Sequence, residues 1–490
     1  MNRLLRGIQS HTTELCVLDT LLSFSNIPFL FYYANEANDP KFMPAELLRD
    51  SFTMALLDFP VLVGHLEMDG RGHAKIVVDA GSLNAPEYIE SQSNVHFRDL
   101  QASRFSWNAL PDGVATAGPV TTADSAGEMK LANIHVVRLR DNSGIVLFVN
   151  ASHAVFDGVG YCAFVTRWAD ICKSMHAGHA PSRLVAFQGN FARSTLTRHT
   201  PNDRKALDDC TRDMFTTSGL LARWLAWISP KTRGTLISNA VSLPHNVGHL
   251  FHISADKLAS LRGSLREHTG GIQYISDNDI ITALVSMLVA QSEAELGSWT
   301  LDLSSMGSLV SSLASALLIS KKEFATEIVV DTRPRLAGLS TKNYIGNAVF
   351  ATCLTNPLSV MTGGIGARSL AQVAVRIRQL VSSIDAQYIG QLLDTLNGNP
   401  SRFMCPLARD TTRMPAVVSN QSRFALYKAD FGNGIPTWVS PIKVMFPHYV
   451  SIIPVHPSTS GYGIHITMSK QAMANILRNK FWMNAVELLY

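Results

Sequence analysis

The sequence predicts an α/β protein of two lobes with mixed sheets, and three observations favour this fold class. The protein is 490 residues long, a length that suits two or three domains. Hydrophobic residues make up 46% of the sequence and charged residues 16%, which is typical of a large globular core. Strand-like and helix-like segments alternate in both halves, with a polar stretch at residues 199–213 between them. We therefore expect an N-terminal lobe at residues 1–190, a crossover connector at residues 191–245 and a C-terminal lobe at residues 246–490.

The composition indicates which partners the protein can have and in which compartment it is expected. The formal net charge is only +4, and lysine and arginine are scattered without a basic tail, which argues against a nucleic-acid partner. The six cysteines form no C-x-x-C pair and no zinc-spaced set with histidine, so we expect reduced thiols and no metal. The N-terminus lacks the apolar core of a signal peptide. Residues 307–320 are apolar but short and serine-rich, which makes a poor membrane span. We expect a soluble cytoplasmic protein.

The elements of the first half follow from its hydrophobic spacing. Residues 44–59 carry apolar side chains at helical intervals and end before a proline. Two apolar runs then flank Asp69 and Gly70, which is the chemistry of a β-hairpin turn. Residues 133–150 predict a second hairpin with an Asp-Asn-Ser-Gly turn, and its second strand leads directly into the stretch ASHAVFDGVG. The stretch GYCAFVTRWADICKSM, which follows, shows helical spacing.

The connector and the second half show the same mixture. Residues 219–230 are amphipathic and contain two tryptophans; we expect this helix to dock on the protein's own surface rather than on a membrane. A short strand leads to Ser254, which reads as the N-cap of a helix. Ser276, with an aspartate three residues later, resembles a capping box at the start of another helix. A late β-pair precedes a final amphipathic helix at residues 468–488.

The sequence contains several histidines that are followed by an aspartate four residues later, and one of them differs from the others. The pattern H-x-x-x-D occurs four times, at His65/Asp69, His153/Asp157, His199/Asp203 and His252/Asp256. The first pair falls in the hairpin turn, the third is interrupted by a proline at a helix start, and the fourth ends in the first turn of a helix. His153 alone follows an apolar, strand-like run and is itself followed by Gly158 and Gly160, which permit close backbone approach.

Two interpretations of His153 follow from the residues alone. A neutral histidine at the end of a strand can take a proton near pH 7 and act as a catalytic base. A buried structural histidine with an aspartate nearby fits the same pattern. Asp157 would pair with an arginine and fix the loop rather than act on substrate. The residues leave both interpretations open.

In combination, the motifs resemble those of the BAHD acyltransferase family. The stretch NASHAVFDGVG matches the central H-x-x-x-D-G motif of that family, and DFGNG at residues 430–434 matches its C-terminal D-F-G-W-G motif. Further family segments are matched by FPVLVGHL, VVDTRPRL, NYIGNAVF and SNQSRF, so the resemblance covers nearly the whole sequence. Within the family, the sequence is most similar to the fungal branch. The resemblance implies two chloramphenicol-acetyltransferase-like lobes with the site at their interface, a monomer, acyl-CoA as co-substrate and no resident metal.

The resemblance also implies roles for individual residues. His153 would deprotonate the hydroxyl or amine of a small, secondary-metabolite acceptor, which attacks the acyl-CoA thioester without a covalent enzyme intermediate. Asp157 would pair with Arg333 and, with Gly158, support the loop. A structural turn would be formed by Asp430, Gly432 and Gly434. Contacts to the oxyanion or the acyl group would come from Ser419 or Gln421. Ser276 would contact CoA, or act only as a helix cap.

Departures from the family pattern keep other functions open. Asn433 replaces the tryptophan of D-F-G-W-G, and Gln421 stands where many members carry a tryptophan beside the acyl site, which leaves the oxyanion partner undecided. A condensation-domain-like enzyme using carrier-protein thioesters shares the implied fold, although Ser152 replaces the first histidine of its H-H-x-x-x-D-G motif. A non-catalytic relative that only binds a ligand is the third alternative.

Overall fold

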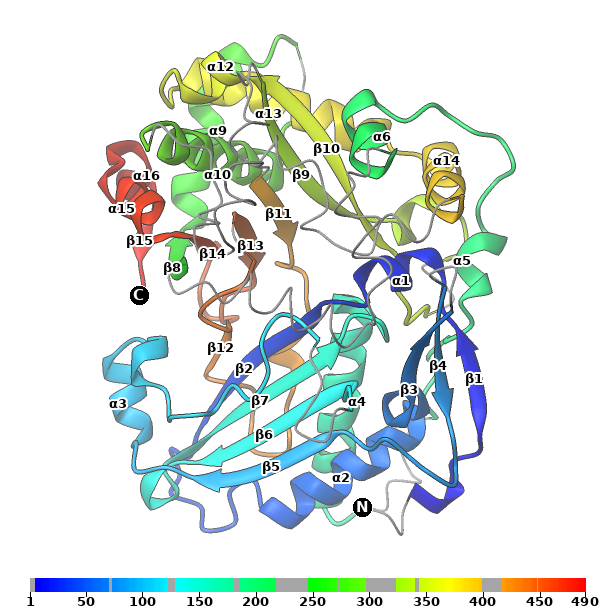
Figure 1. Cartoon of the computed structure of the whole chain (residues 1–490). Coiled ribbons are helices and arrows are strands. Elements are labelled where there is room, and N and C mark those ends of the chain that lie inside the picture. Colours follow the sequence, from blue (N-terminus) through cyan, green and yellow to red (C-terminus); the bar gives the residue numbers. More distant parts are fainter. Residues whose placement is uncertain are drawn as a thin grey trace, which may run out of the picture.

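The computed structural model describes residues 5–69, 73–121, 128–179, 186–216, 246–271, 274–296, 323–339, 343–398, 416–446 and 448–490. Its strands form two large sheets and one small one, and Figure 1 shows the large sheets as two lobes, one above the other. The five-stranded sheet has the order β12 (Trp438–Pro441), β2 (Asn26–Ala34), β7 (Gly144–Ser152), β6 (Ala132–Arg138) and β5 (Glu87–Gln92). The seven-stranded sheet has the order β10 (Val349–Pro357), β9 (Glu323–Asp331), β11 (Ala416–Asn420), β13 (Tyr449–Ile453), β14 (Tyr462–Ser469), β8 (Asn246–Ile253) and β15 (Glu487–Leu488). The small sheet has the order β1 (His11–Glu14), β4 (Ala74–Val78) and β3 (His65–Met68).

The helices of the first part are α1 (Val17–Leu22), α2 (Ala45–Asp58), α3 (Phe97–Ala102), α4 (Gly158–His176), α5 (Ser194–Arg198) and α6 (Asp209–Thr216). Those of the second part are α9 (Ala255–Leu265), α10 (Asp277–Ala294), α12 (Leu358–Thr362), α13 (Ala367–Ser383), α14 (Ala386–Asn397), α15 (Lys470–Arg478) and α16 (Lys480–Ala485). Short 3-10 helices occur at Leu5–Gly7, Pro60–Val63, Trp107–Ala109, Arg140–Asn142, Arg266–His268, Arg333–Arg335 and Leu426–Lys428. None of the described helices is both long and apolar enough to cross a membrane.

Both large sheets combine parallel and antiparallel pairs, as the sequence predicts. In the five-stranded sheet β5 pairs with β6 in parallel, and the other neighbours are antiparallel. In the seven-stranded sheet β11 is parallel to both of its neighbours, β9 and β13. The predicted hairpin over residues 133–150 is the antiparallel β6–β7 pair, and β3 with β4 forms the earlier hairpin.

Strand β7, which leads to His153, is buried along its whole length. Its side chains alternate between two apolar clusters because successive residues of a strand point to opposite faces. Leu147 and Val149 pack in the cluster that contains α2 and α4. Val146 and Phe148 pack in a cluster that also contains residues of the second half of the sequence, such as Leu250. The continuous apolar run of β7 therefore reflects a strand that is covered on both faces.

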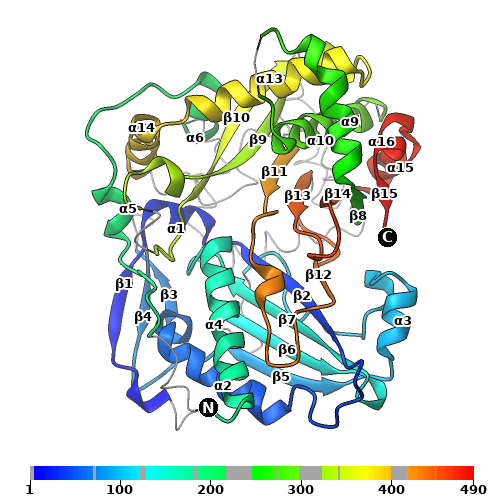
Figure 2. The same cartoon turned by 180° about the vertical axis from the view of Figure 1, so that it is seen from behind.

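Some elements pack in the lobe formed mainly by the other half of the sequence, so the lobes do not follow the boundaries at residues 190 and 246 strictly. Strand β12 comes from the second half but pairs with β2 of the five-stranded sheet. Helix α1 comes from the first half, yet Leu18 and Leu21 belong to the apolar cluster of the seven-stranded sheet. Figure 2 shows α4 lying against the lower sheet with the segment that leads to β12 beside it. Each lobe is thus completed by residues of the other half.

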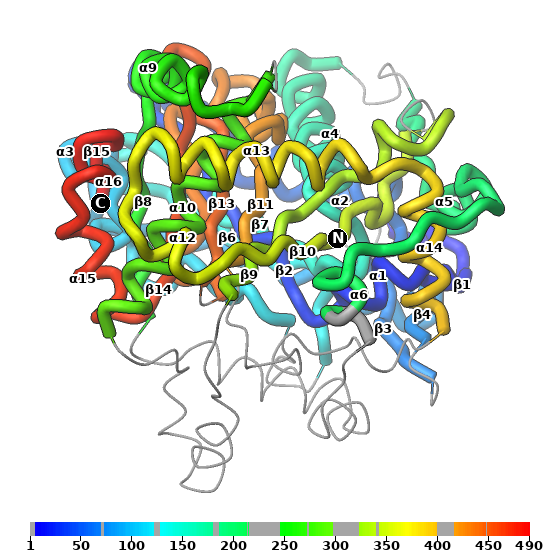
Figure 3. The backbone as a smooth tube through the Cα atoms, turned by 90° about the horizontal axis from the view of Figure 1, so that it is seen from above, coloured from blue at the N-terminus to red at the C-terminus, as the bar shows by residue number. Residues whose placement is uncertain are grey.

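The described part of the connector runs from the lower lobe to the upper one. Arg204 forms an ion pair with Asp394 of α14, and Lys205 pairs with Asp385 at the start of that helix. Helix α6 packs on the edge strand β10, and the view from above in Figure 3 shows α5, α6 and α14 along the same side of the molecule. The expected amphipathic helix at residues 219–230 and the apolar window at 307–320 lie outside the described residues.

Three expectations differ from the structure. The final helix is two helices, α15 and α16, because the backbone of Asn479 is extended and its side chain caps α16. His199 ends α5 rather than starting a helix. Cys210 and Cys353 form a disulfide, whereas the sequence predicts reduced thiols; their spacing in the sequence gives no sign that α6 and β10 lie side by side.

The disulfide supplies a test of how the connector is attached. It closes a segment of 143 residues, and a loop of that length corresponds to as much as about 5 kcal/mol in the chain-entropy model. We expect dithiothreitol to lower the melting temperature of the wild type but not that of Cys210→Ser. Denatured, unreduced protein should show two fewer free thiols than the six cysteines of the sequence. Six reactive thiols would instead support the sequence-based expectation.

Candidate active site

His153 lies in the tight turn that joins β7 to α4. Its backbone N–H donates to the carbonyl oxygen of Ser25 at 2.8 Å, which ties the turn to the segment before the neighbouring strand β2. His153 is a partly exposed residue, whereas the four residues that follow it are buried. His153 is therefore the residue of this turn that solvent reaches in part.

Asn347, from the loop before β10, fixes the protonation pattern of this imidazole. The Asn347 side-chain NH₂ donates to the His153 carbonyl oxygen at 2.7 Å and to Asp19 Oδ1 at 2.7 Å. Since both partners can only accept, the amide oxygen of Asn347 must be the atom that lies 2.8 Å from His153 Nδ1. His153 Nδ1 then carries the hydrogen and donates it, and Nε2 keeps a free lone pair.

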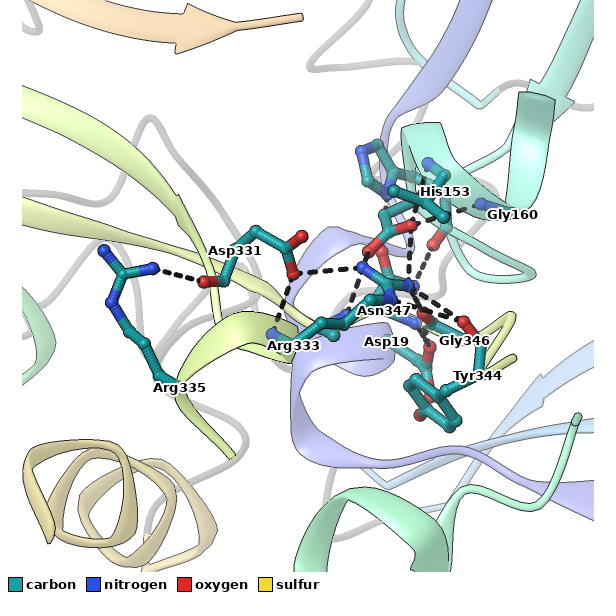
Figure 4. Close-up of polar contacts among 12 residues, drawn as sticks. Asp19, His153, Gly160, Asp331, Arg333, Arg335, Tyr344, Gly346 and Asn347 are labelled. Carbon is teal, nitrogen blue, oxygen red and sulfur yellow. Dashed lines mark hydrogen bonds and ion pairs between the residues drawn. The ribbon is translucent and has the colours of Figure 1, made fainter. Parts of the chain in front are cut away.

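Asp19 and Arg193 stand behind Asn347 (Figure 4 shows Asp19 with Asn347). Asp19 Oδ1 also accepts from the backbone N–H of Asn347 at 3.0 Å. Asp19 Oδ2 forms an ion pair with Arg193 Nε at 3.0 Å, and both side chains are almost completely buried. Arg193 in turn donates to the carbonyl oxygen of Val155, in the same turn as His153. Groups from α1, the connector and the second half of the sequence thus meet at one turn.

The surroundings hold the pKa of His153 below its ordinary value. Burial disfavours the imidazolium and lowers the pKa, while the charge of Asp157 and the hydrogen bond to Asn347 oppose this shift only in part. A histidine held in this way is neutral at physiological pH. It can accept a proton at Nε2, which is the property that general base catalysis requires.

Asp157 is the N-cap of α4 and is 1% exposed. Its Oδ1 accepts from the backbone N–H groups of Val159 and Gly160 at 3.1 and 3.3 Å. Its Oδ2 accepts from the backbone N–H of Ala348 at 3.0 Å. An aspartate at this position satisfies free N–H groups of the first helical turn and interacts favourably with the helix dipole. The carboxylate is therefore fully engaged within the fold.

Arg333 completes the partners of Asp157, as the resemblance implies. Its Nη1 and Nη2 donate to the two carboxylate oxygens at 2.8 and 3.0 Å, a bidentate pair. The remaining N–H groups reach Asp331 and the carbonyl oxygens of Tyr344 and Gly346 (Figure 4). Burial would lower the pKa of Arg333, but the charge of Asp157 raises it above its ordinary value. The predicted ion pair is confirmed, and it joins α4 to the segments beside β9 and β10.

The two glycines after Asp157 are required by close packing. A Cβ atom on Gly158 would lie 1.9 Å from the ring of Phe424. A Cβ atom on Gly160 would lie 2.3 Å from the carbonyl oxygen of Ile345. Both distances are far below van der Waals contact, so the second half of the sequence reaches the start of α4 only because these side chains are absent.

The DFGNG turn lies at the opposite end of α4. Asp430 Oδ1 accepts from the backbone N–H groups of Gly432 and Gly434, and its Oδ2 pairs with Lys173 Nζ at 2.6 Å. Both glycines have a positive φ, 108° and 101°, which favours glycine over other residues. At ~1.5 Å per residue, Lys173 is about 22 Å along α4 from its first residue. Asn433 Oδ1 accepts from the backbone N–H of Met43, so the turn fastens the second half of the sequence to the lower lobe.

Ser419 and Gln421 lie together with Tyr449, a residue that sequence reasoning did not single out. The Gln421 Nε2 atom donates to Tyr449 Oη at 3.1 Å and lies 3.4 Å from Ser419 Oγ. The Tyr449 ring contacts Phe446, and that ring contacts Phe24, the residue before the Ser25 that holds His153. The hydrogen-bonding group formed by Ser419, Gln421 and Tyr449 thus lies on the upper lobe along a line of contacts that leads to His153. Neither Ser419 nor Gln421 hydrogen-bonds to His153.

Ser276 is the N-cap of α10, and its capping box with Asp279 is present as predicted. Ser276 Oγ accepts from the backbone N–H of Asp279 at 3.3 Å, and Asp279 also pairs with Arg378 of α13. The structure therefore accounts for Ser276 as a helix cap. A contact with CoA stays a prediction.

Sequence reasoning missed the three residues of the polar network next to His153: Asn347, Asp19 and Arg193. Asn347 lies inside the segment NYIGNAVF, which the resemblance brought forward without giving the asparagine a role. Asp19 is in the first turn of α1 and closes a capping box on Cys16, so its local pattern suggests a helix cap alone. Arg193 is one of many scattered arginines. Only the fold brings these positions together.

The Asp157–Arg333 pair gives a prediction about stability. Asp157→Asn keeps a residue that can cap α4 but leaves the Arg333 charge buried with its main partner gone, which should lower the free energy of unfolding by about 3–5 kcal/mol. The double variant Asp157→Asn/Arg333→Gln should be more stable than the single one, because no buried charge is left unpaired. Urea denaturation measures both.

The control for this prediction is Asp58→Asn. It removes the partly exposed Asp58–Arg167 pair and should change the free energy of unfolding by about 1 kcal/mol or less. If Asp157→Asn is no more harmful than this control, the junction of the lobes does not depend on the Asp157–Arg333 pair.

Comparison with known proteins agrees with the geometry. Residues 6–218 and 307–481 match the model of the Transferase family. Putrescine hydroxycinnamoyltransferase 1 of Oryza sativa subsp. japonica is 23% identical over 476 residues, covering 95% of this protein and 93% of the rice protein. O-acetyltransferase pyr7 of Aspergillus fumigatus is 23% identical over 382 residues, covering 71% of this protein and 67% of the fungal protein. The crystal structure of F. graminearum TRI101 complexed with coenzyme A and deoxynivalenol has a TM-score of 0.71 and 15% identity, covering 98% of this protein and 100% of TRI101. That likeness shows the fold of two chloramphenicol-acetyltransferase-like lobes, and the family match shows that the protein belongs to the Transferase family, the acyl-CoA-dependent BAHD acyltransferases.

Proposed function

We propose that this acyltransferase moves the acyl group of a CoA thioester to the hydroxyl or amine of a small, secondary-metabolite acceptor, with His153 as the general base. The observation that carries the proposal is the hydrogen bond from His153 Nδ1 to Asn347 Oδ1 at 2.8 Å. It leaves Nε2 unprotonated on the one partly exposed residue of the turn. An oriented, neutral imidazole is what the reaction needs.

The reaction follows from the placement of that lone pair. His153 Nε2 takes the proton of the acceptor O–H or N–H while the acceptor atom forms a bond to the thioester carbonyl carbon. The resulting tetrahedral oxyanion collapses, the carbon–sulfur bond breaks, and the imidazolium returns its proton to the CoA thiolate. The acyl group passes directly between the substrates, so no bond to the enzyme forms. A positioned base contributes roughly 10²–10⁴-fold to such a step, and holding two substrates at one histidine adds a proximity effect.

The oxyanion requires a hydrogen-bond donor fixed in advance. We assign this role to the group formed by Ser419, Gln421 and Tyr449, whose polar atoms are linked to one another on the upper lobe. Burial raises the pKa of Tyr449, so its hydroxyl stays protonated and able to donate. Asp157 has no direct chemical role in this scheme, because its oxygens already accept five hydrogen bonds within the fold.

Several finer expectations belong to the same proposal. The two lobes and the connector would follow the boundaries expected from the sequence, with β12 and α1 exchanged between them. Ser276 would add a contact to CoA. The relatives include a putrescine hydroxycinnamoyltransferase and an O-acetyltransferase, so both amines and alcohols are acceptor classes to test. A cytoplasmic monomer of fungal type stays part of the proposal, and the thiol count of the Cys210–Cys353 pair bears on the compartment because disulfides are rare in the cytosol.

The alternatives make different demands on the same residues. A condensation-domain-like enzyme has a second histidine at the position of Ser152, but here Ser152 is buried and its Oγ accepts from the backbone N–H of Ala154. A non-catalytic relative would not need the arrangement that keeps His153 Nε2 free. We therefore favour the CoA-dependent transfer reaction.

Replacing His153 tests the proposed base directly. His153→Ala should lower acceptor-dependent release of CoA thiol by roughly 10²–10⁴-fold, measured with a panel of acyl-CoAs and pooled alcohols and amines. The matched control is His252→Ala, which removes a histidine of the same H-x-x-x-D spacing that bonds to the Ser460 carbonyl oxygen and should leave the rate unchanged. Equal activity of His153→Ala and wild type would contradict the assignment. Calorimetric titration with CoA tests the donor independently of the acceptor panel.

The pH dependence of the rate is a further prediction. Because the pKa of His153 lies below its ordinary value, more than half of the imidazole is unprotonated at pH ~6.5. The rate kcat/KM should therefore stay level through neutral pH and fall only as the pH drops through the lowered pKa, below the usual histidine range. A rise of kcat/KM centred above pH ~7 would mean that a different group is the base.

A further inference from the structure

The geometry points to Asp19 as a positioning residue that sets the tautomer of His153 by fixing the amide of Asn347. This inference rests on the proposed role of His153 as the base, and it assigns the helix-capping carboxylate of α1 a part in the reaction. Asp19 does not touch His153. It would act entirely through Asn347.

The hydrogen-bond and ion-pair partners of the Asp19 carboxylate are N–H donors and a positive charge. The side chain is 0% exposed. Oδ1 accepts from the backbone N–H and the side-chain NH₂ of Asn347 at 3.0 and 2.7 Å. Oδ2 accepts from the backbone N–H of Cys16 at 2.9 Å and faces Arg193 Nε at 3.0 Å. A buried carboxylate is tolerated when it is paired and hydrogen-bonded in this way.

This arrangement decides which way the Asn347 amide points. An asparagine amide can turn by 180° and exchange its NH₂ and oxygen with little change of shape. Asp19 Oδ1 and the His153 carbonyl oxygen can only accept, so together they hold the NH₂ group on their side and turn the oxygen toward His153 Nδ1. If the amide were reversed, its NH₂ would face His153 Nδ1, and the imidazole would need to carry its hydrogen on Nε2. That tautomer offers no lone pair for the acceptor proton.

The variant Asp19→Asn separates this role from simple packing. It is nearly isosteric, but one of its two side-chain atoms becomes a donor. The charge of Arg193 attracts the remaining oxygen, so the new NH₂ group faces Asn347 and repels its NH₂ group. Only the His153 carbonyl oxygen then still favours the present orientation of the amide. A wrong tautomer should then accumulate at His153 although the side chain of His153 is unchanged.

A purely structural role for Asp19 is the competing explanation. Asp19 caps α1 through Cys16, and losing the pair with Arg193 should lower stability in either case. Stability alone therefore decides nothing. The tautomer of His153, and the division of the effect between kcat and KM, are readouts that a structural role would not change.

The experiment uses the full-length protein with ¹⁵N-labelled histidine. Long-range proton–nitrogen NMR distinguishes a pyrrole-like from a pyridine-like ring nitrogen, and the His153→Gln variant identifies the His153 signals. We expect the Nδ1–H form in the wild type and the Nε2–H form in Asp19→Asn. We also expect kcat to fall roughly 10- to 100-fold, by analogy with the loss of residues that orient metal-binding histidines, while KM for acyl-CoA is unchanged. In an Asn347→Ala background, Asp19→Asn should have no further effect on kcat.

The controls make the result decisive. Asp58→Asn removes another aspartate–arginine pair, with Arg167, and should leave both tautomer and kcat as in the wild type. If Asp19→Asn does not fold, Asp19→Glu replaces it, because glutamate is the usual capping-box residue and keeps the charge for Arg193. Its longer side chain should carry the carboxylate past the Asn347 amide, with the same expected loss of the Nδ1–H form.

The failures of this inference and of the proposed function are distinguishable. A folded Asp19 variant with the wild-type tautomer and kcat would overturn the positioning role, even if His153→Ala is inactive. A changed tautomer with an unchanged kcat would support the positioning of His153 by Asp19 and contradict the role of His153 as the base. A loss of kcat without a change of tautomer would overturn the inference.

Discussion

The buried ion pair between Asp157 and Arg333 is the interaction on which the site depends. Asp157 caps α4 of the lower lobe, while Arg333 follows β9 of the upper sheet, and the two lie 176 residues apart in the sequence. The same carboxylate accepts the backbone N–H of Ala348, the residue that follows Asn347. One side chain therefore fixes the start of a helix in one lobe and the loop that carries Asn347 in the other. Without it, the loop that carries Asn347 would lose the hydrogen bond that Ala348 donates to the lower lobe.

The position of Asp157 at the start of α4 explains why a histidine and an aspartate four residues apart do not form a proton relay here. A turn from strand to helix leaves free N–H groups at the first helical turn, and Asp157 satisfies two of them. Its remaining capacity is used by Arg333 and Ala348. The imidazole of His153, by contrast, is held in the fold by its contact with Asn347 and otherwise kept free for substrate. The chemistry and the architecture are thus divided between two residues four positions apart.

The sequence predicted those parts of the site that follow from a local hydrophobic pattern or from a family motif. The strand before His153, the helix after it and the hairpin that precedes both follow from hydrophobic period and turn residues, and the Asp157–Arg333 pair follows from the family resemblance. Asp19, Arg193 and Asn347 were not reached, because each has an ordinary local explanation and their partners lie far along the sequence; Asp19 and Asn347 are separated by 328 residues. The sequence did not predict the exchange of β12 and α1 between the lobes, for the same reason. Contacts between distant segments leave no periodic trace in the sequence.

The use of an amide rather than a carboxylate beside His153 has a consequence for its strength as a base. A carboxylate hydrogen-bonded directly to Nδ1 would stabilise the imidazolium and raise the pKa of His153, so that part of the enzyme would be protonated near neutral pH. Asn347 fixes the tautomer without adding a charge, and the negative charge of Asp19 is one residue further away and balanced by Arg193. Burial then sets the pKa, which lies below the ordinary value. The result is a base of moderate strength that is available at neutral pH, and a transient imidazolium that readily gives its proton to the departing thiolate.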